Sequence, residues 1–149
     1  MPLTQDVVRS HAVHTPLILA VPAKANAVLF AGAITALDAG FAVPASDAAG
    51  LLIVGVNQTS LDNTGGANGV IVGGDGHGSE RFVEVDRDGM WEFAVAGTAP
   101  VAGQNAFVVD DDTVSADATV NKLRLGQFIE PGLYGGWMVL IQPDLPAVV

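Results

Sequence analysis

The residues best suited to chemistry in this chain are its histidines and a short run of acidic residues. His77 lies between Asp75 and Glu80 in a glycine-rich segment. An imidazole flanked by carboxylates can act as a general base or help to hold a metal ion. A lone histidine in a polar loop is far more often solvated, so we expect no active site in this segment.

His11 and His14 lie three residues apart, a spacing that would place both on one face of a helix. Val13 and Pro16 disfavour a helix in this stretch. Two histidines also provide too few ligands for a zinc site. The chain contains no cysteine, which excludes disulfide bonds and thiolate metal sites.

Asp110, Asp111 and Asp112 form the acidic run, with Asp117 close behind, and their oxygens could bind Ca²⁺ or Mg²⁺. The run lacks the glycine and the glutamate that an EF-hand loop requires at its sixth and twelfth positions. We therefore expect a turn and not a cation site. The serines lack the pattern of a nucleophile elbow. The sequence thus predicts no catalytic residues, no metal, no cofactor and no enzyme activity.

The segments that would position these residues have the patterns of β-strands. Residues 51–56 form a continuous apolar run, typical of a strand buried on both faces. Residues 83–86 and 91–95 alternate on either side of Asp88 and Gly89, which predicts a β-hairpin with an Asp-Gly turn. That hairpin would place Trp91, Phe93 and Val95 on one face.

Further short strands are expected along the rest of the chain. They cover residues 28–30, 33–37, 41–43, 107–109, 122–126 and 137–141. A helix through residues 23–37 is the alternative for the first two, but Gly32, Ile34 and Thr35 favour strands. Many short strands at a spacing of about 10 residues indicate a mainly β fold, a compact small sandwich or barrel.

The length of 149 residues suits one domain. We predict an extended N-terminal arm over residues 1–24, a β domain over 25–142 and a C-terminal tail over 143–149. Pro16 and Pro22 bias their predecessors toward extended conformations. An extended segment can add a strand to a partner's sheet edge, and a disordered tail is the alternative.

The apolar residues of this arm are the ones expected to contact a partner. They are Leu17, Ile18, Leu19 and Val21. Because the arm would lie outside the β domain, we expect deletion of residues 1–22 to leave that domain folded. The loop at 133–136 could separately expose the ring of Tyr134, which would suit contact with a protein or a sugar.

The composition limits the possible partners. Asp and Glu number 16 against 6 Lys and Arg, for a net charge of −10, which disfavours nucleic acid and anionic membranes. Hydrophobic residues make up 50% and charged residues 15%, so we expect other subunits to cover part of the surface. No signal-peptide pattern is present at the N-terminus, and we expect a soluble protein made in the cytoplasm.

Several motifs between residues 27 and 141 stand in a particular order. They are ITALDAGFAVPA at 34–45, VGV at 54–56, DNTGGANG at 62–69, VEV at 83–85 with Gly89, VVDDDTV at 108–114, LG at 125–126 and GWMV at 136–139. In this order they resemble the capsid decoration proteins, or cement proteins, of tailed bacteriophages. Residues 1–24 and 71–79 depart from the family pattern, as an extension and an insertion.

The resemblance implies a non-enzymatic, β-tulip-like domain on the outer capsid surface of the virion, synthesised in the host cytoplasm. It would clamp neighbouring subunits of the major capsid protein, stabilise the capsid and form a homotrimer. The implied partners are therefore the major capsid protein and further copies of the chain. The alternative is a sugar- or cell-surface-binding β module, such as a head-fibre or adhesin domain.

Overall fold

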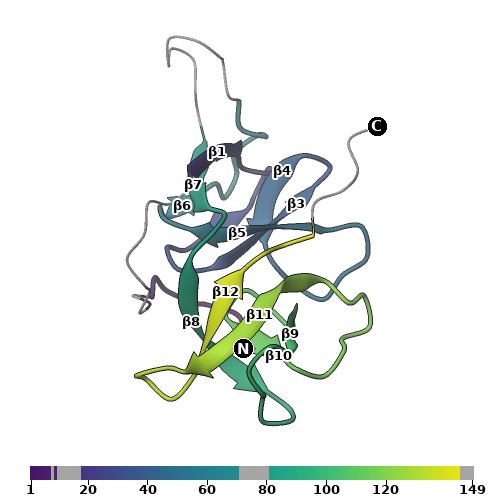
Figure 1. The fold of residues 1–149 in the computed structure, drawn as a ribbon. Coiled ribbons are helices and arrows are strands. Elements are labelled where there is room, and N and C mark those ends of the chain that lie inside the picture. The colour runs from purple at the N-terminus through teal and green to yellow at the C-terminus, as the bar shows by residue number, and fades with distance from the viewer. Residues whose placement is uncertain (8, 10–17, 71–80, 145–149) are drawn as a thin grey trace.

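The computed structural model describes residues 1–7, 9, 18–70 and 81–144. In this part of the chain all regular elements are β-strands, which confirms the predicted mainly β fold (Figure 1). The strands are β1 Ile18–Pro22, β2 Val28–Leu29, β3 Ile34–Asp38, β4 Phe41–Pro44, β5 Leu52–Asn57, β6 Leu61–Asp62, β7 Phe82–Asp86, β8 Met90–Ala96, β9 Asn105–Val108, β10 Thr113–Ser115, β11 Arg124–Pro131 and β12 Trp137–Ile141.

One half of the molecule is an antiparallel sheet with the order β1-β7-β5-β3-β4. A two-residue turn joins β3 to β4, and Asp38 pairs with Phe41 across it. The turn residues Ala39 and Gly40 have φ values of 52° and 89°, the left-handed conformation that a tight hairpin turn needs at both positions. The short strands β2 and β6 pair beside this sheet.

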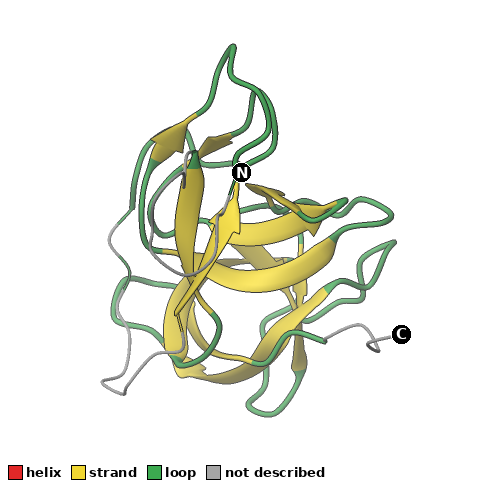
Figure 2. Ribbon diagram, turned by 90° about the horizontal axis from the view of Figure 1, so that it is seen from above, coloured by secondary structure: helices red, strands yellow, loops and turns green. Residues whose placement is uncertain are grey.

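The other half is a closed barrel with the order β10-β8-β12-β11-β9. In it β8 and β10 run parallel, and the other neighbours are antiparallel. Gly126 lies where β11 approaches β12 closely, since a Cβ there would lie 1.8 Å from the carbonyl oxygen of Leu140. The sheet lies above the barrel in Figure 1, and Figure 2 shows both from above.

Sheet and barrel share a hydrophobic core. The main cluster joins Ile34 and Val56 of the sheet to Phe93 and Phe128 of the barrel, all at most 1% exposed. A second cluster covers the opposite face of the sheet and includes Val54. Strand β5 is therefore buried on both faces, as its apolar run predicts.

The predicted hairpin of residues 83–95 is wrong. Strand β7 pairs with β1 and β5, whereas β8 pairs with β10 and β12. Residues 87–89 carry the chain from the sheet into the barrel, and the carbonyl of Gly89 accepts a hydrogen bond from the N–H of Ile141. Alternation shows which face of a strand is buried but not which strand is its partner. Trp91 and Phe93 are buried as expected, at 7% and 1% exposure.

The chain expected to form an arm includes a strand of the molecule's own sheet. In β1, Leu19 pairs with Val85 and Val21 with Val83 of β7. The side chain of Val21 belongs to the second core cluster. The sheet edge that this segment joins therefore belongs to its own domain. The sheet includes residues on both sides of position 24, where the sequence predicts the end of the arm.

Candidate functional site

The acidic turn Asp110–Asp112 joins β9 to β10, and the N-terminal residues lie against it. The N–H of Leu3 donates to Asp111 Oδ1 at 2.8 Å, and Arg9 Nη2 forms an ion pair with Asp112 Oδ1 at 2.6 Å. The terminal ammonium group of Met1 lies 2.5 Å from Asp110 Oδ2. Among the described residues, no group of three or more His, Asp or Glu side chains is placed to hold a metal ion. The absence of metal binding in solution stays a prediction.

Burial raises the pKa of Asp111, and the neighbouring charges of Asp110 and Asp112 add to this effect. Burial also acts to raise the pKa of Asp110. There it is outweighed by hydrogen bonds from the terminal ammonium group and from the N–H of Asp112, so the pKa of Asp110 is lowered. Adjacent carboxyl groups in one turn therefore bind protons with different affinities.

Arg9 fastens the N-terminal residues to both halves of the molecule. Its side chain is only 7% exposed. Nε donates to the carbonyl oxygen of Gly32 at 2.5 Å, and Nη1 donates to that of Glu92 at 2.9 Å. The guanidinium carbon lies 4.4 Å from the centre of the Phe93 ring. Burial lowers the pKa of Arg9, and the hydrogen bond to Asp112 opposes that shift.

The residues before Arg9 continue this contact along the link between β2 and β3. The N–H of Val7 donates to the carbonyl of Ala31 at 3.0 Å, and the N–H of Ala31 donates to the carboxylate of Asp6 at 3.0 Å. A Cβ at Gly32 would lie 2.5 Å from the carbonyl oxygen of Val7, so this approach requires glycine. We call residues 3–9, of which residue 8 is not described, the N-terminal strap.

Glu92 shapes the loop 132–136 between β11 and β12. The residue is 5% exposed. Its carboxylate accepts hydrogen bonds from the N–H groups of Leu133, Tyr134 and Gly136 at 3.0, 2.8 and 2.9 Å. Converging N–H groups of this kind favour a negative charge. In the loop that they form, the residues Leu133 and Tyr134 are 84% and 80% exposed.

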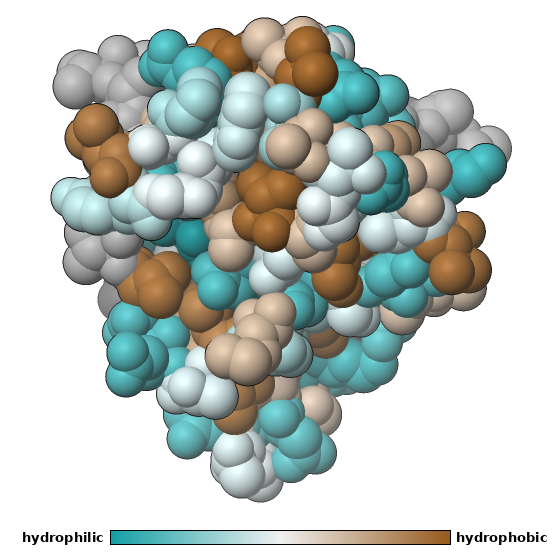
Figure 3. All heavy atoms as spheres, turned by 90° about the horizontal axis from the view of Figure 1, so that it is seen from below, coloured by the Kyte–Doolittle hydropathy of each residue, from teal (hydrophilic) through white to brown (hydrophobic). Residues whose placement is uncertain are grey.

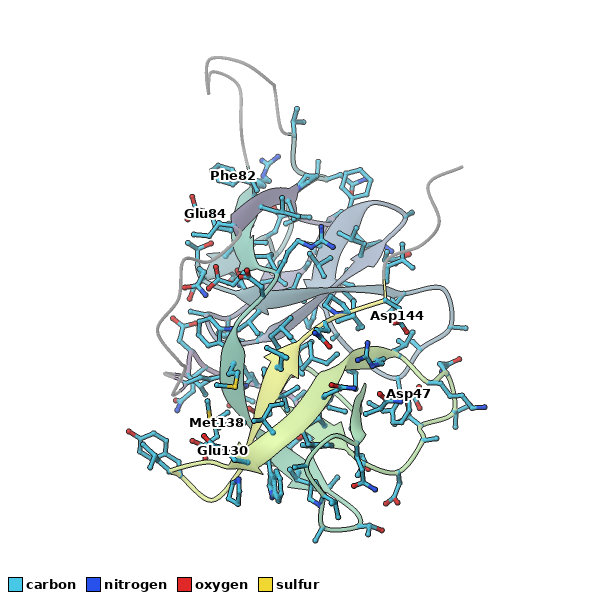
Figure 4. All side chains as sticks on the ribbon, in the orientation of Figure 1. Asp47, Phe82, Glu84, Glu130, Met138 and Asp144 are labelled. Atoms are coloured by element: carbon cyan, nitrogen blue, oxygen red, sulfur yellow. The ribbon has the colours of Figure 1, made fainter. Side chains whose placement is uncertain are left out.

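Figure 4 labels Glu130 and Met138 near the base of this projecting loop. Tyr134 in this loop is 80% exposed, so the exposed aromatic residue suggested by the sequence is present. Glu92 alternates with the core residues Trp91 and Phe93 along β8, a pattern that by itself places it on the opposite face of the strand. In the sequence, only the glycines around Leu133 and Tyr134 indicate that backbone N–H groups of this loop could converge on an anion.

An open hollow of about 390 Å³ lies between the strap and this loop. Its lining includes Val7, Arg9, Ala94, Val95 and Tyr134. The charged side chains of the lining, Arg9 and Glu92, form the hydrogen bonds that hold the strap and the loop. Both charged side chains of the lining therefore help to hold the strap and the loop in place.

The predicted arm residues have different environments. Ile18 is 48% exposed, Leu19 is half-buried and Val21 is 7% exposed. Val21 cannot contact a capsid in this arrangement because its side chain is packed in the core. Leu17, His11, His14 and the trio Asp75, His77 and Glu80 lie outside the described residues.

The carboxylate of Asp117 accepts a hydrogen bond from the N–H of Thr98 and takes no part in the acidic turn's contacts with the strap. In the part of the chain that the structure covers, we find no helix with the length and apolar character of a membrane span.

No protein-family model matches the sequence, and no curated protein matches it. Among solved structures, the chain is similar to a chain of "The capsid of Myoviridae Phage XM1". The TM-score is 0.58 at 17% sequence identity, and the match covers 94% of this chain and 92% of that chain. The likeness spans nearly the whole of both chains, so the protein shares the fold of a chain in a phage capsid structure.

Proposed function

We propose that this protein is a structural component of a bacteriophage head that binds the outer capsid surface and clamps neighbouring major capsid subunits. The observation that carries the proposal is the fold likeness to a chain of a phage capsid structure, which covers 94% of this chain. The ordered motifs that resemble decoration proteins support the same role. In this role the protein acts by binding and not by catalysis.

The build of the molecule suits a clamp. A core shared by sheet and barrel makes one rigid body, which transmits force between the subunits it contacts. The strap ties the two halves together through Arg9. A net charge of −10 keeps neighbouring particles apart in solution.

We also propose that the protein acts as a homotrimer, which the family resemblance implies. A composition of 50% hydrophobic and 15% charged residues supports contact between copies. Analytical ultracentrifugation of the free protein and counting of copies on the particle test this. A monomer in both settings would exclude the trimer.

The capsid role is tested with heads of the parent phage prepared without this protein. We expect the purified protein to sediment with these heads, to saturate at a fixed number of copies per capsid subunit and to raise the temperature at which the heads break open. Absence of binding to both unexpanded and expanded heads would contradict the proposal.

The alternative, a sugar- or cell-surface-binding module, draws on the exposed ring of Tyr134. It would be favoured if the protein bound host cells or a glycan panel while leaving heads unbound. Both assays should be run on one preparation. Binding in one assay then shows that the protein is properly folded, and the absence of binding in the other is meaningful.

A further inference from the structure

Asn68 is the one asparagine in the chain that a glycine follows, and it is exposed. Its side-chain amide is one of many polar groups interspersed with apolar ones on the surface, as the face seen from below illustrates (Figure 3). Gly69 sets Asn68 apart, because a residue without a Cβ does not hinder attack by its own backbone nitrogen on the preceding side chain. An asparagine–glycine pair is therefore the most favourable place in a chain for loss of the asparagine amide.

The reaction is deamidation, and water is its second reactant. The backbone nitrogen of Gly69 bonds to Cγ of Asn68, the bond between Cγ and Nδ2 breaks, and ammonia leaves with the proton that the backbone nitrogen gives up. Water then opens the cyclic imide. Opening at one carbonyl gives aspartate, and opening at the other gives isoaspartate, in which the backbone runs through the side chain.

In the structure, hydrogen bonds engage both reacting groups of loop 63–69. The N–H of Gly69 donates to the carbonyl of Ala23 at 2.7 Å, and Gly69 is buried. Oδ1 of Asn68 accepts a hydrogen bond from the N–H of Ala25 at 2.8 Å. The nitrogen that must lose its proton therefore shares that proton with a carbonyl, and the amide that it must attack is held by the backbone of Ala25.

The loop is fastened to the turn of residues 24–27 by side-chain amides. Asn26 has a φ of 62°, and its Oδ1 accepts a hydrogen bond from the N–H of Gly65 at 2.8 Å. Nδ2 of Asn63 donates to the carbonyl of Lys24 at 2.9 Å. Loops held by hydrogen bonds at the surface open locally at a much lower cost than global unfolding.

We propose that Asn68 is a site of spontaneous deamidation and that opening of loop 63–69 from turn 24–27 controls its rate. The closed arrangement withholds both reacting groups, so the reaction proceeds from the open one. Either product adds one negative charge to the net charge of −10. Isoaspartate also places an extra carbon in the backbone, which displaces the N–H of Gly69 from the carbonyl of Ala23. The product is thus a permanent record that the loop has opened.

The first test follows the unmodified protein at mildly alkaline pH, in buffer and in urea that unfolds it. Peptide mapping by mass spectrometry measures the loss of each asparagine amide. In urea, we expect Asn68 to react before every other asparagine. In buffer, we expect its rate to be at least about tenfold lower, because opening must come first. A different first site in urea, or equal rates in the two solutions, would overturn the inference.

Ala25→Pro tests the control by the turn. Ala25 is the second residue of a turn whose third residue has a positive φ, the type II arrangement that favours proline at this place. Proline has no N–H to donate to Oδ1 of Asn68. We expect the folded variant to deamidate about two- to tenfold faster than the unmodified protein, the range expected for loss of one hydrogen bond. In urea the two rates should agree, because residue 25 is distant from Asn68 in the sequence.

Asn26→Gly is a second variant in case proline disturbs the turn. Glycine tolerates the positive φ and lacks the oxygen that accepts the N–H of Gly65. It should likewise raise the rate in buffer and leave the rate in urea unchanged. Circular dichroism establishes which variants are folded, and if neither folds, the comparison of buffer with urea decides. Folded variants that deamidate no faster than the unmodified protein would overturn the control by the turn, whereas the capsid role would stand.

Discussion

Arg9 is the residue on which the attachment of the strap most depends. Arg9→Met keeps most of the side chain's length but leaves the Asp112 carboxylate and the carbonyls of Gly32 and Glu92 without their donor. We expect the free energy of unfolding to fall by about 3 kcal/mol in urea titration. Lys122→Met, at an exposed position, should change it by less than about 0.5 kcal/mol. Equal effects of the two substitutions would show that the strap does not contribute to stability.

Asp111 provides a test in which the sign of the pH dependence matters. Because burial raises its pKa, the folded protein binds this proton more tightly than the unfolded chain. The carboxyl group therefore costs stability above its folded pKa, and the cost disappears as the pH falls toward the ordinary aspartate value of about 4.

Asp111→Asn keeps an oxygen to accept the N–H of Leu3 but has no charge to bury. We expect the variant to be more stable than the unmodified protein at about pH 7, with a difference that shrinks toward about pH 4. Asp144→Asn, at a side chain 77% exposed, should have little effect at either pH. Urea titrations at the two pH values measure this, and a variant less stable at neutral pH would contradict it.

Phe93 tests the assignment of the shared core. It is 1% exposed, so Phe93→Ala should lower the free energy of unfolding by about 3–5 kcal/mol. Phe82 is 36% exposed on β7, and Phe82→Ala should have a clearly smaller effect. A loss below about 1 kcal/mol for Phe93→Ala in denaturant titration would mean that its ring does not stabilise the core.

At the scale of elements, the pairing of β1 changes the expected effect of deleting residues 1–22. Deleting residues 1–22 would remove an edge strand that pairs with β7 and take Val21 out of the second core cluster. It would also remove Arg9 and the strap. We therefore expect the truncated protein to lose its cooperative unfolding transition in circular dichroism.

A deletion of residues 1–5 should retain that transition, because β1, Val7 and Arg9 stay in place. If the longer truncation melted like the full chain, β1 would not be part of the stable fold.

Individual strands could be predicted from the sequence more reliably than their partners. The run at 51–56 and the alternation at 91–95 depend on local burial, and β5 and β8 occur there. The pairing of β8 with β10 and β12 depends on closure of the barrel, which local periodicity does not report. The chain at 83–95 therefore reads as one hairpin although its strands belong to different halves.

The candidate site, too, was only partly predictable from local sequence patterns. The glycines around Leu133 and Tyr134 suggest an exposed loop, which the structure contains. Glu92 is separated from these residues by more than 40 positions, and Arg9 from Asp112 by 103. A local pattern contains no trace of such contacts, so the buried carboxylate and the strap become visible only in the fold.

At the scale of the whole molecule, the protein is an acidic body in which a sheet and a barrel are joined. Sheet and barrel share one core, and the strap crosses from the β2–β3 link to the acidic turn of the barrel.

Cryo-electron microscopy maps of the parent phage head, recorded with and without this protein, are the sharpest test of its proposed place on the capsid. We expect additional density on the outer surface that fits the joined sheet and barrel and contacts the major capsid subunits. Heads that look identical in the two maps despite excess protein, or density located inside the shell, would contradict it.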